Sequence, residues 1–192
     1  MAKKRIVYFD KPGSHNTDET LRLALERAKE LDIKDIVVAS TTGETGVKAS
    51  KIFKDHNLVV VAHRYGFRKP GEWEFKEERK QEIIKNGGKV FAGIHALSGV
   101  ERSILRKFGT ICPVEIIANT LKIFGQGMKV AVEIVIMAAD AGLIPIDKEV
   151  ISIAGTRRGA DTAIVVKPSH SHDIFDMEIR EIICMPRSKV VQ

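Results

Sequence analysis

Short apolar runs alternate with amphipathic segments through the first half of the chain. Three of these runs have the length and the β-branched composition of buried strands: residues 5–9, 35–39 and 58–62. Residues 17–31 lie between the first two runs and predict a helix with an apolar face of Leu21, Leu25, Ala28 and Leu31. Strands that are apolar throughout must be covered on both faces. The order of these segments therefore predicts an α/β fold whose mostly parallel sheet lies between two helical layers.

The second half of the chain changes in character. Its first part predicts a further strand at 89–92 and helices at 77–86, 98–108, 113–124 and 128–141. Ser98, followed by Glu101, is typical of a helix capping signature. Its last part predicts strands without good intervening helices, at 150–154, 163–166 and 179–185. We therefore expect an antiparallel strand or hairpin at one edge of a three-layer α/β/α sandwich.

Length and composition indicate the broad class of the protein. The 192 residues are 44% hydrophobic and 29% charged, which favours one globular domain over residues 1–192. No stretch supplies 18 unbroken apolar residues, and the apolar run near the start is too short for a signal peptide. We therefore expect a cytoplasmic protein without membrane contact.

The net charge of +6 raises the hypothesis of a nucleic-acid partner. The basic residues are scattered, however, and most alternate with acidic ones, as in KEERKQE. Aromatic residues make up only 6% of the chain. These observations favour a solvated surface with local anion pockets, and we expect no nucleic acid among the partners.

A polar loop follows the apolar run at 35–39 and leads into a helical pattern. Backbone N–H groups and hydroxyls at such a helix start favour a phosphate. In this loop Gly43 allows a close turn and the hydroxyls donate without adding charge. The alternative is a plain capped helix start. The motif is neither a Walker A loop nor a dinucleotide fingerprint, and its candidate binding residues are Ser40, Thr41, Thr42, Gly43, Glu44 and Thr45.

Polar and aromatic side chains also follow the next two predicted strands. Loops after the carboxyl ends of parallel strands converge on one crevice, so we expect these groups to face the phosphate loop. They are His63, Tyr65, Gly66 and Phe67 after the third strand, and His95 and Ser98 after the fourth.

The spacing Ser-x-Thr-Gly-x-Thr at residues 40–45 resembles the sugar-phosphate loop of the C-terminal domain of pyruvate kinases. Glu44 departs from that family, in which a neutral or basic residue is usual, and this argues against a bisphosphate effector. The segment EVISIAGTRRGADTAIVVKP resembles the strand, glycine-rich loop and strand that fold over the effector there. The resemblance places Thr156, Arg157, Arg158 and Gly159 in that loop, although two arginines in a turn can also be exposed charge.

Nearly the whole chain resembles the stand-alone archaeal proteins of this domain family. The matching segments are KPGSHNT, VVAS, GET, HALSGVERS, EIVIMAADAGLIP, RGADTA and EIICMPR. The resemblance implies the three-layer fold and a pocket that can hold flavin mononucleotide (FMN). We find no catalytic barrel ahead of the domain and therefore do not expect pyruvate kinase chemistry.

The sequence thus predicts a protein that binds a phosphorylated small molecule, with FMN as the cofactor that the resemblance implies. A sensor module for a sugar phosphate or nucleotide and a nucleic-acid binder are the alternatives, and a homo-oligomer is compatible with each.

No catalytic residue is assigned. Glu133 and Asp140 share one face of an apolar helix. A carboxylate at Glu133 must face a polar pocket, a basic partner or a subunit interface, so we predict that Glu133 has a hydrogen-bonding or basic partner, in a structural ion pair or as a catalytic acid. The run HSHD at 170–173 favours an exposed loop over a metal site, and Ser98 favours a cap over a hydrolase triad.

Overall fold

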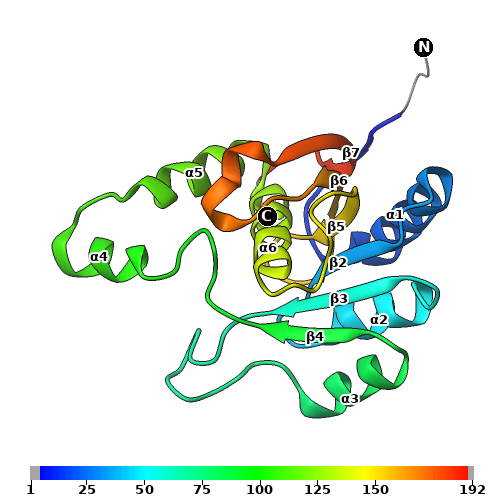
Figure 1. The fold of residues 1–192 in the computed structure, drawn as a ribbon, viewed down its shortest axis with the longest axis horizontal. Helices are drawn as coiled ribbons and strands as arrows, with labels where there is room; N and C mark the ends of the chain where they lie inside the picture. The colour runs from blue at the N-terminus through cyan, green and yellow to red at the C-terminus, as the bar shows by residue number, and fades with distance from the viewer. Residues whose placement is uncertain (1–4, 190–192) are drawn as a thin grey trace.

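The computed structural model describes residues 5–189 and contains a seven-stranded sheet with the order β1-β7-β6-β5-β2-β3-β4 (Figure 1). All neighbouring strands pair in parallel except at β6, which runs antiparallel to β5 and β7. This confirms a mostly parallel sheet with its antiparallel pairings toward one edge. The strands are β1 (Val7–Phe9), β2 (Asp35–Ala39), β3 (Asn57–Ala62), β4 (Lys89–Ala92), β5 (Val150–Ala154), β6 (Thr162–Lys167) and β7 (Glu178–Pro186).

The helices lie where the periodicity predicts them, with small differences at their ends. They are α1 (Thr17–Leu31), α2 (Glu44–Ile52), α3 (Glu77–Lys85), α4 (Glu101–Phe108), α5 (Pro113–Leu121) and α6 (Gln126–Asp140). Three short 3-10 helices are η1 (Ser14–Asn16), η2 (Lys122–Phe124) and η3 (Ser171–Asp176). Within residues 5–189, none of these helices is both long and apolar enough to pass through a bilayer.

Alternate residues of the central strands bury against different helices, which makes the three layers. On β2, Ile36 and Val38 pack in the cluster that contains α1, α2 and α3. Val37, between them, packs in the cluster that contains α5 and α6. The core side chains of both clusters are almost fully buried. The α/β/α sandwich predicted from the sequence is thereby confirmed.

The capping signature predicted at Ser98 does not form. Helix α4 begins at Glu101, with Val100 at its N-cap and no capping hydrogen bond from a side chain. The Glu101 carboxylate instead accepts the backbone N–H of Val114 at 2.9 Å, near the start of α5. A capping box has its glutamate three residues after the N-cap, whereas Glu101 directly follows the N-cap Val100, so the capping box predicted at Ser98 is wrong.

Candidate functional site

A cavity of about 600 Å³ opens at the carboxyl ends of β2, β3 and β5. Ser40, His63 and Gly155 each follow directly after one of these strands and line it. Helix α6 forms one wall through its buried face, and the segment of α4 and α5 contributes Arg102, Glu115, Ala118 and Lys122. The parallel arrangement explains this position, because it brings successive strand ends to the same edge of the sheet.

The polar loop 40–45 lies on one side of the cavity at the start of α2. The Ser40 hydroxyl accepts the N–H of Gly46 at 3.2 Å, and the Thr42 hydroxyl accepts from the Arg79 guanidinium at 3.0 Å. Each hydroxyl keeps its own hydrogen for another acceptor. In the described part of the chain, the first two amides of α2, at Glu44 and Thr45, are not used by the helix. The loop therefore presents several donors and no fixed positive charge.

Gly43 is required by packing and by backbone conformation. Its φ of 91° lies in the left-handed region that favours glycine. A Cβ at this position would lie 2.7 Å from the Arg79 Cβ and 3.0 Å from the Phe75 ring. The close approach is therefore to α3 and the segment before it, a neighbour that the sequence did not reveal.

Three rings form a wall at the other side of the cavity, on the loops after β3 and β4. The Phe67 ring lies 4.0 Å from His63 and 5.1 Å from His95, measured between ring centroids. All three residues line the cavity. The rings are tilted against or stacked on one another, and such a group of rings offers apolar surface against which a planar ligand group can pack.

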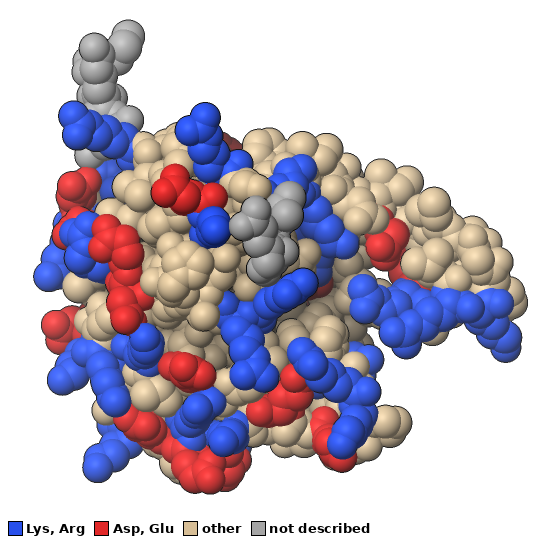
Figure 2. Space-filling model, turned by 180° about the vertical axis from the view of Figure 1, so that it is seen from behind, with Lys and Arg blue, Asp and Glu red and all other residues tan. Residues whose placement is uncertain are grey.

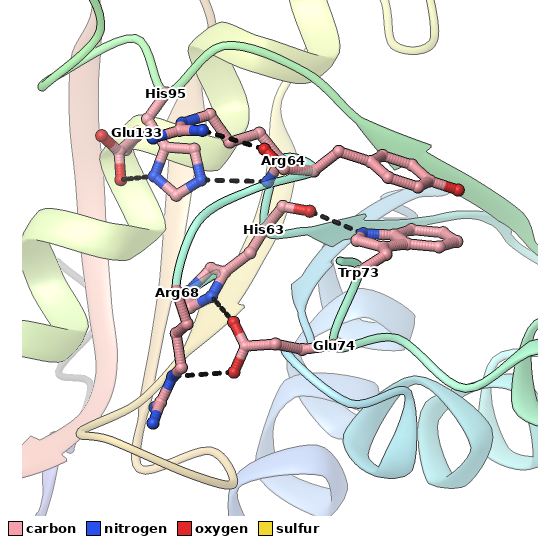
Figure 3. Close-up of polar contacts among 8 residues, drawn as sticks. His63, Arg64, Arg68, Trp73, Glu74, His95 and Glu133 are labelled. Carbon is pink, nitrogen blue, oxygen red and sulfur yellow. Dashed lines mark hydrogen bonds and ion pairs between the residues drawn. The ribbon is translucent and has the colours of Figure 1, made fainter. Parts of the chain in front are cut away.

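His63 is held by a chain of polar contacts that the sequence did not show (Figure 3). Its Nδ1 lies 2.9 Å from a Glu74 oxygen, and the other oxygen of Glu74 contacts Arg68 Nε at 2.8 Å. The Trp73 indole N–H also donates to the His63 carbonyl at 2.7 Å. With the Glu74 carboxylate on Nδ1, the Nε2 of His63 is the atom that can exchange a proton or a hydrogen bond with a ligand.

His95 is buried more deeply than His63, with 11% of its side chain exposed. Its Nδ1 lies 3.9 Å from Glu133, and its Nε2 accepts the backbone N–H of Arg64 at 3.4 Å (Figure 3). Burial lowers the pKa of His95 to about 4; Glu133 opposes this shift, and the nearby charges of His63, Lys129 and Arg64 add to it. His95 is therefore a neutral ring at physiological pH.

This burial predicts a pH-dependent stability. Between about pH 6.5 and 4 the unfolded chain binds a proton at His95 and the native chain does not. The free energy of unfolding should therefore fall as the pH falls, by up to about 3 kcal/mol from this residue. Urea unfolding of the parent and of His95→Gln, measured from pH 7 to 4, checks it. The free energy of unfolding of His95→Gln should fall less with pH than that of the parent. An equal fall in the two proteins would contradict the prediction.

Glu133 lies on α6 and is buried within the single chain, with 3% of the residue exposed. One of its oxygens accepts the Leu97 N–H at 3.0 Å, and the other contacts Lys129 Nζ at 2.5 Å. Burial lowers the pKa of Lys129, and the Glu133 carboxylate opposes this shift. The prediction that Glu133 has a hydrogen-bonding or basic partner is confirmed. Asp140 lies apart from this pair and accepts the backbone N–H of Ser171 at 3.0 Å.

The glycine-rich loop after β5 is tied down by Asp161, a residue that sequence reasoning missed. Asp161 is fully buried, and one of its oxygens accepts the N–H groups of Gly13 at 2.9 Å and Thr156 at 3.1 Å. Its other oxygen accepts the Thr162 hydroxyl at 2.9 Å. Arg157 directly follows Thr156 and has a φ of 63°, so its side chain is carried on a constrained turn. The signal in the sequence was an aspartate at the start of an apolar strand.

Of the sixteen residues that the sequence analysis places around the site, twelve line the cavity: Ser40, Thr41, Thr42, Glu44, Thr45, His63, Phe67, His95, Ser98, Arg157, Arg158 and Gly159. The other four do not line it. Gly43 and Thr156 support the loops as described above. Gly66 lies in a turn and donates its N–H to Glu72 at 2.9 Å. Tyr65 is 59% exposed and stacks on Trp73 with ring centroids 4.9 Å apart.

The HSHD run lies away from this cavity, at η3. His170 contacts Asp140 at 3.2 Å, and His172 contacts Asp173 at 2.9 Å. Over residues 5–189, three or more His, Cys, Asp or Glu side chains do not gather anywhere as a metal site would require.

Basic side chains outnumber acidic ones around the cavity. The acidic lining residues are Glu44, Glu115 and Glu133, whereas the basic ones are Lys48, Arg68, Arg102, Lys122, Lys129, Arg157 and Arg158. Figure 2 shows Lys and Arg along the side of the projecting α4–α5 segment that faces the body of the molecule. The lining therefore favours an anionic ligand.

A family model and several solved structures are similar to this chain. The family model described as pyruvate kinase, alpha/beta domain, matches residues 18–166. Among solved structures, a pyruvate kinase from Cryptosporidium parvum is 15% identical, with a TM-score of 0.41 over 79% of this chain and 22% of that chain. A second Cryptosporidium parvum pyruvate kinase structure is 15% identical, with a TM-score of 0.40 over 83% and 23%. An O-ureido-L-serine synthase is 17% identical, with a TM-score of 0.31 over 68% and 40%. The chain spans less than a quarter of the length of these pyruvate kinases.

Proposed function

Since the chain belongs to the family of the pyruvate kinase alpha/beta domain, we propose that it binds a phosphorylated small molecule in the cavity at the carboxyl ends of β2, β3 and β5. The observation that carries the proposal is a helix start, at α2, that opens into a cavity whose charged lining residues are mostly basic. Free amides at a helix start and nearby cations are the groups that bind phosphate in proteins.

The phosphate is proposed to lie on the loop 40–45. The Thr45 and Thr42 side chains line the cavity there, and Arg157 lines it from the loop after β5. Because the hydroxyls supply donors and Arg157 supplies charge, the two loops together suit a dianionic phosphate monoester. Glu44, which is also at this position, disfavours a second phosphate next to the first.

The candidate ligand is FMN, and the cavity residues fit its two ends. A volume of about 600 Å³ lies within the range of cofactor sites, about 300–1,000 Å³. The wall of His63, Phe67 and His95 would hold the flat ring, and the loop 40–45 would hold the phosphate. FMN would supply redox chemistry when bound. At the ring end His63 offers a proton acceptor at Nε2, with Glu74 holding its orientation.

The test is to purify the protein and to identify what binds. An absorbance spectrum and mass spectrometry of the released small molecule come first, followed by calorimetric titration with FMN, riboflavin and inorganic phosphate. Binding of FMN but not riboflavin supports the proposal. A colourless protein that retains a sugar phosphate or a nucleotide indicates the sensor module instead. Failure to bind any phosphate monoester contradicts the proposal.

Thr45→Ala is expected to raise the dissociation constant for FMN about tenfold. The lost contact is a hydrogen bond to a charged group, which contributes about 1–2 kcal/mol. Thr120→Ala is the matched control, because Thr120 is exposed on α5 and bonds only its own helix at Ile116. Titration calorimetry of the three proteins measures the effect. Equal dissociation constants in all three would place the phosphate elsewhere.

A further inference from the structure

The segment of residues 97–124 is here called the arm; its helix α5 packs on α6, whereas α4 projects away from the rest of the molecule (Figure 1). It contains α4 and α5, and no residue of α4 is buried. A helix of only eight residues is not stable in water by itself, since most helical stability in proteins comes from packing of an apolar face. Among residues 5–189, the amphipathic α4 therefore makes too few of the contacts that such a helix needs.

Exposed apolar side chains are concentrated on and next to the arm. Of the fifteen large apolar residues that are exposed in residues 5–189, eight lie between 94 and 124. On and just before α4 they recur every four residues, which places them on one helix face. We call the set the arm patch: Ile94, Val100, Ile104, Phe108, Ile111, Ile116, Ile123 and Phe124.

A second, mostly apolar cavity lies where the arm joins the body. It has a volume of about 540 Å³, and its apolar lining side chains are those of Phe91, Ile94, Ala96, Val100, Val114, Met137 and Ala141. Phe91 belongs to β4, the strand at the edge of the sheet. An apolar projection and an apolar recess thus occur side by side on one chain.

We propose that a second copy of this chain covers the arm patch, so that the arm of each protomer packs over the recess at the base of the other arm. A two-fold dimer needs one surface that is complementary to itself, and a projection next to a recess has this property. The area also agrees. At roughly 60–120 Å² for each exposed side chain, the arm patch offers on the order of 700 Å² per protomer, close to the approximately 800 Å² of a standard interface.

The charge distribution leaves this face of the arm free for a partner. In Figure 2 the Lys and Arg side chains lie on the side of the arm toward the body, and most of the opposite side is uncharged. Arg102 and Lys122 of the arm line the large cavity. A dimer formed through the arm patch would therefore hold one wall of that cavity in place. The dimer would form without a bound ligand.

The experiment is sedimentation velocity of the full chain, of Phe108→Asp and of the control Ile84→Asp. Phe108 is 67% exposed, so the change should leave the fold intact, which circular dichroism verifies. Ile84 is 47% exposed on α3, outside the arm patch. The parent and Ile84→Asp should have twice the chain mass. Phe108→Asp should dissociate at least roughly 30-fold more readily, as expected for a central apolar contact.

Hydrogen exchange gives a second readout. The amides of α4 should exchange more slowly in the parent than in Phe108→Asp at the same protein concentration, because the dimer alone buries this helix. A parent chain that stays at the single-chain mass up to roughly 100 µM overturns the proposal. An oligomer whose mass is unchanged by Phe108→Asp, or changed equally by Ile84→Asp, overturns it as well.

Discussion

Glu133→Ala is expected to lower the free energy of unfolding by about 3–5 kcal/mol. The substitution removes the acceptor of the Leu97 amide and leaves the Lys129 ammonium, only 9% exposed, without its counter-charge. It also opens a cavity beside the tightly packed face of α6. Urea denaturation at pH 7, followed by circular dichroism, measures the change.

Two further variants distinguish the causes of this loss. Glu133→Leu fills the volume, so it should destabilise less than Glu133→Ala, although Lys129 stays unpaired. Replacing the pair together, with Lys129→Met and Glu133→Leu, should restore most of the stability, since no buried charge is left alone. If every variant unfolds like the parent but fails to bind FMN, the structural role is wrong and Glu133 belongs to the binding site.

The parts of the fold that the sequence predicted are those governed by local periodicity. β2 and α1 were predicted with their observed ends, because an apolar run and a regular helical stripe need no distant partner to be recognised. The start of α4 was predicted three residues too early. Ser98 and Glu101 have the spacing of a capping box, but Glu101 bonds to Val114. A sequence pattern cannot show which distant amide competes for a carboxylate.

Some features of the candidate site could also be predicted from the sequence, and others could not. Strand ends could be placed on one edge of the sheet from topology alone, so His63 and His95 were expected near Thr42. The direction of a side chain in a long loop could not be predicted: Phe67 faces the cavity, whereas Tyr65 stacks outward on Trp73. The carboxylate partners Glu74 and Asp161 were missed for a related reason, because each supports the site through a contact that only the tertiary structure creates.

Asp161→Ala is expected to lower the free energy of unfolding by about 3–5 kcal/mol and to weaken FMN binding about tenfold. The carboxylate accepts two backbone N–H groups and one hydroxyl, and its removal leaves these donors without a partner in a buried place. Thr156 then loses the contact that fixes the turn before Arg157. Since Asp161 itself does not line the cavity, any loss of binding must act through the loops that it holds.

Asp161→Asn is the matched control, because its amide oxygen can accept the Gly13 and Thr156 N–H groups while its NH₂ group faces the Thr162 hydroxyl. The change to asparagine removes the charge but keeps the geometry. The free energy of unfolding should therefore fall by less, about 1–2 kcal/mol. Binding should then remain close to that of the parent. Denaturation and calorimetry on both variants test this order. An Asn variant as damaged as the Ala variant would show that the negative charge, and not the positions of the loops, is what the cavity requires from Asp161.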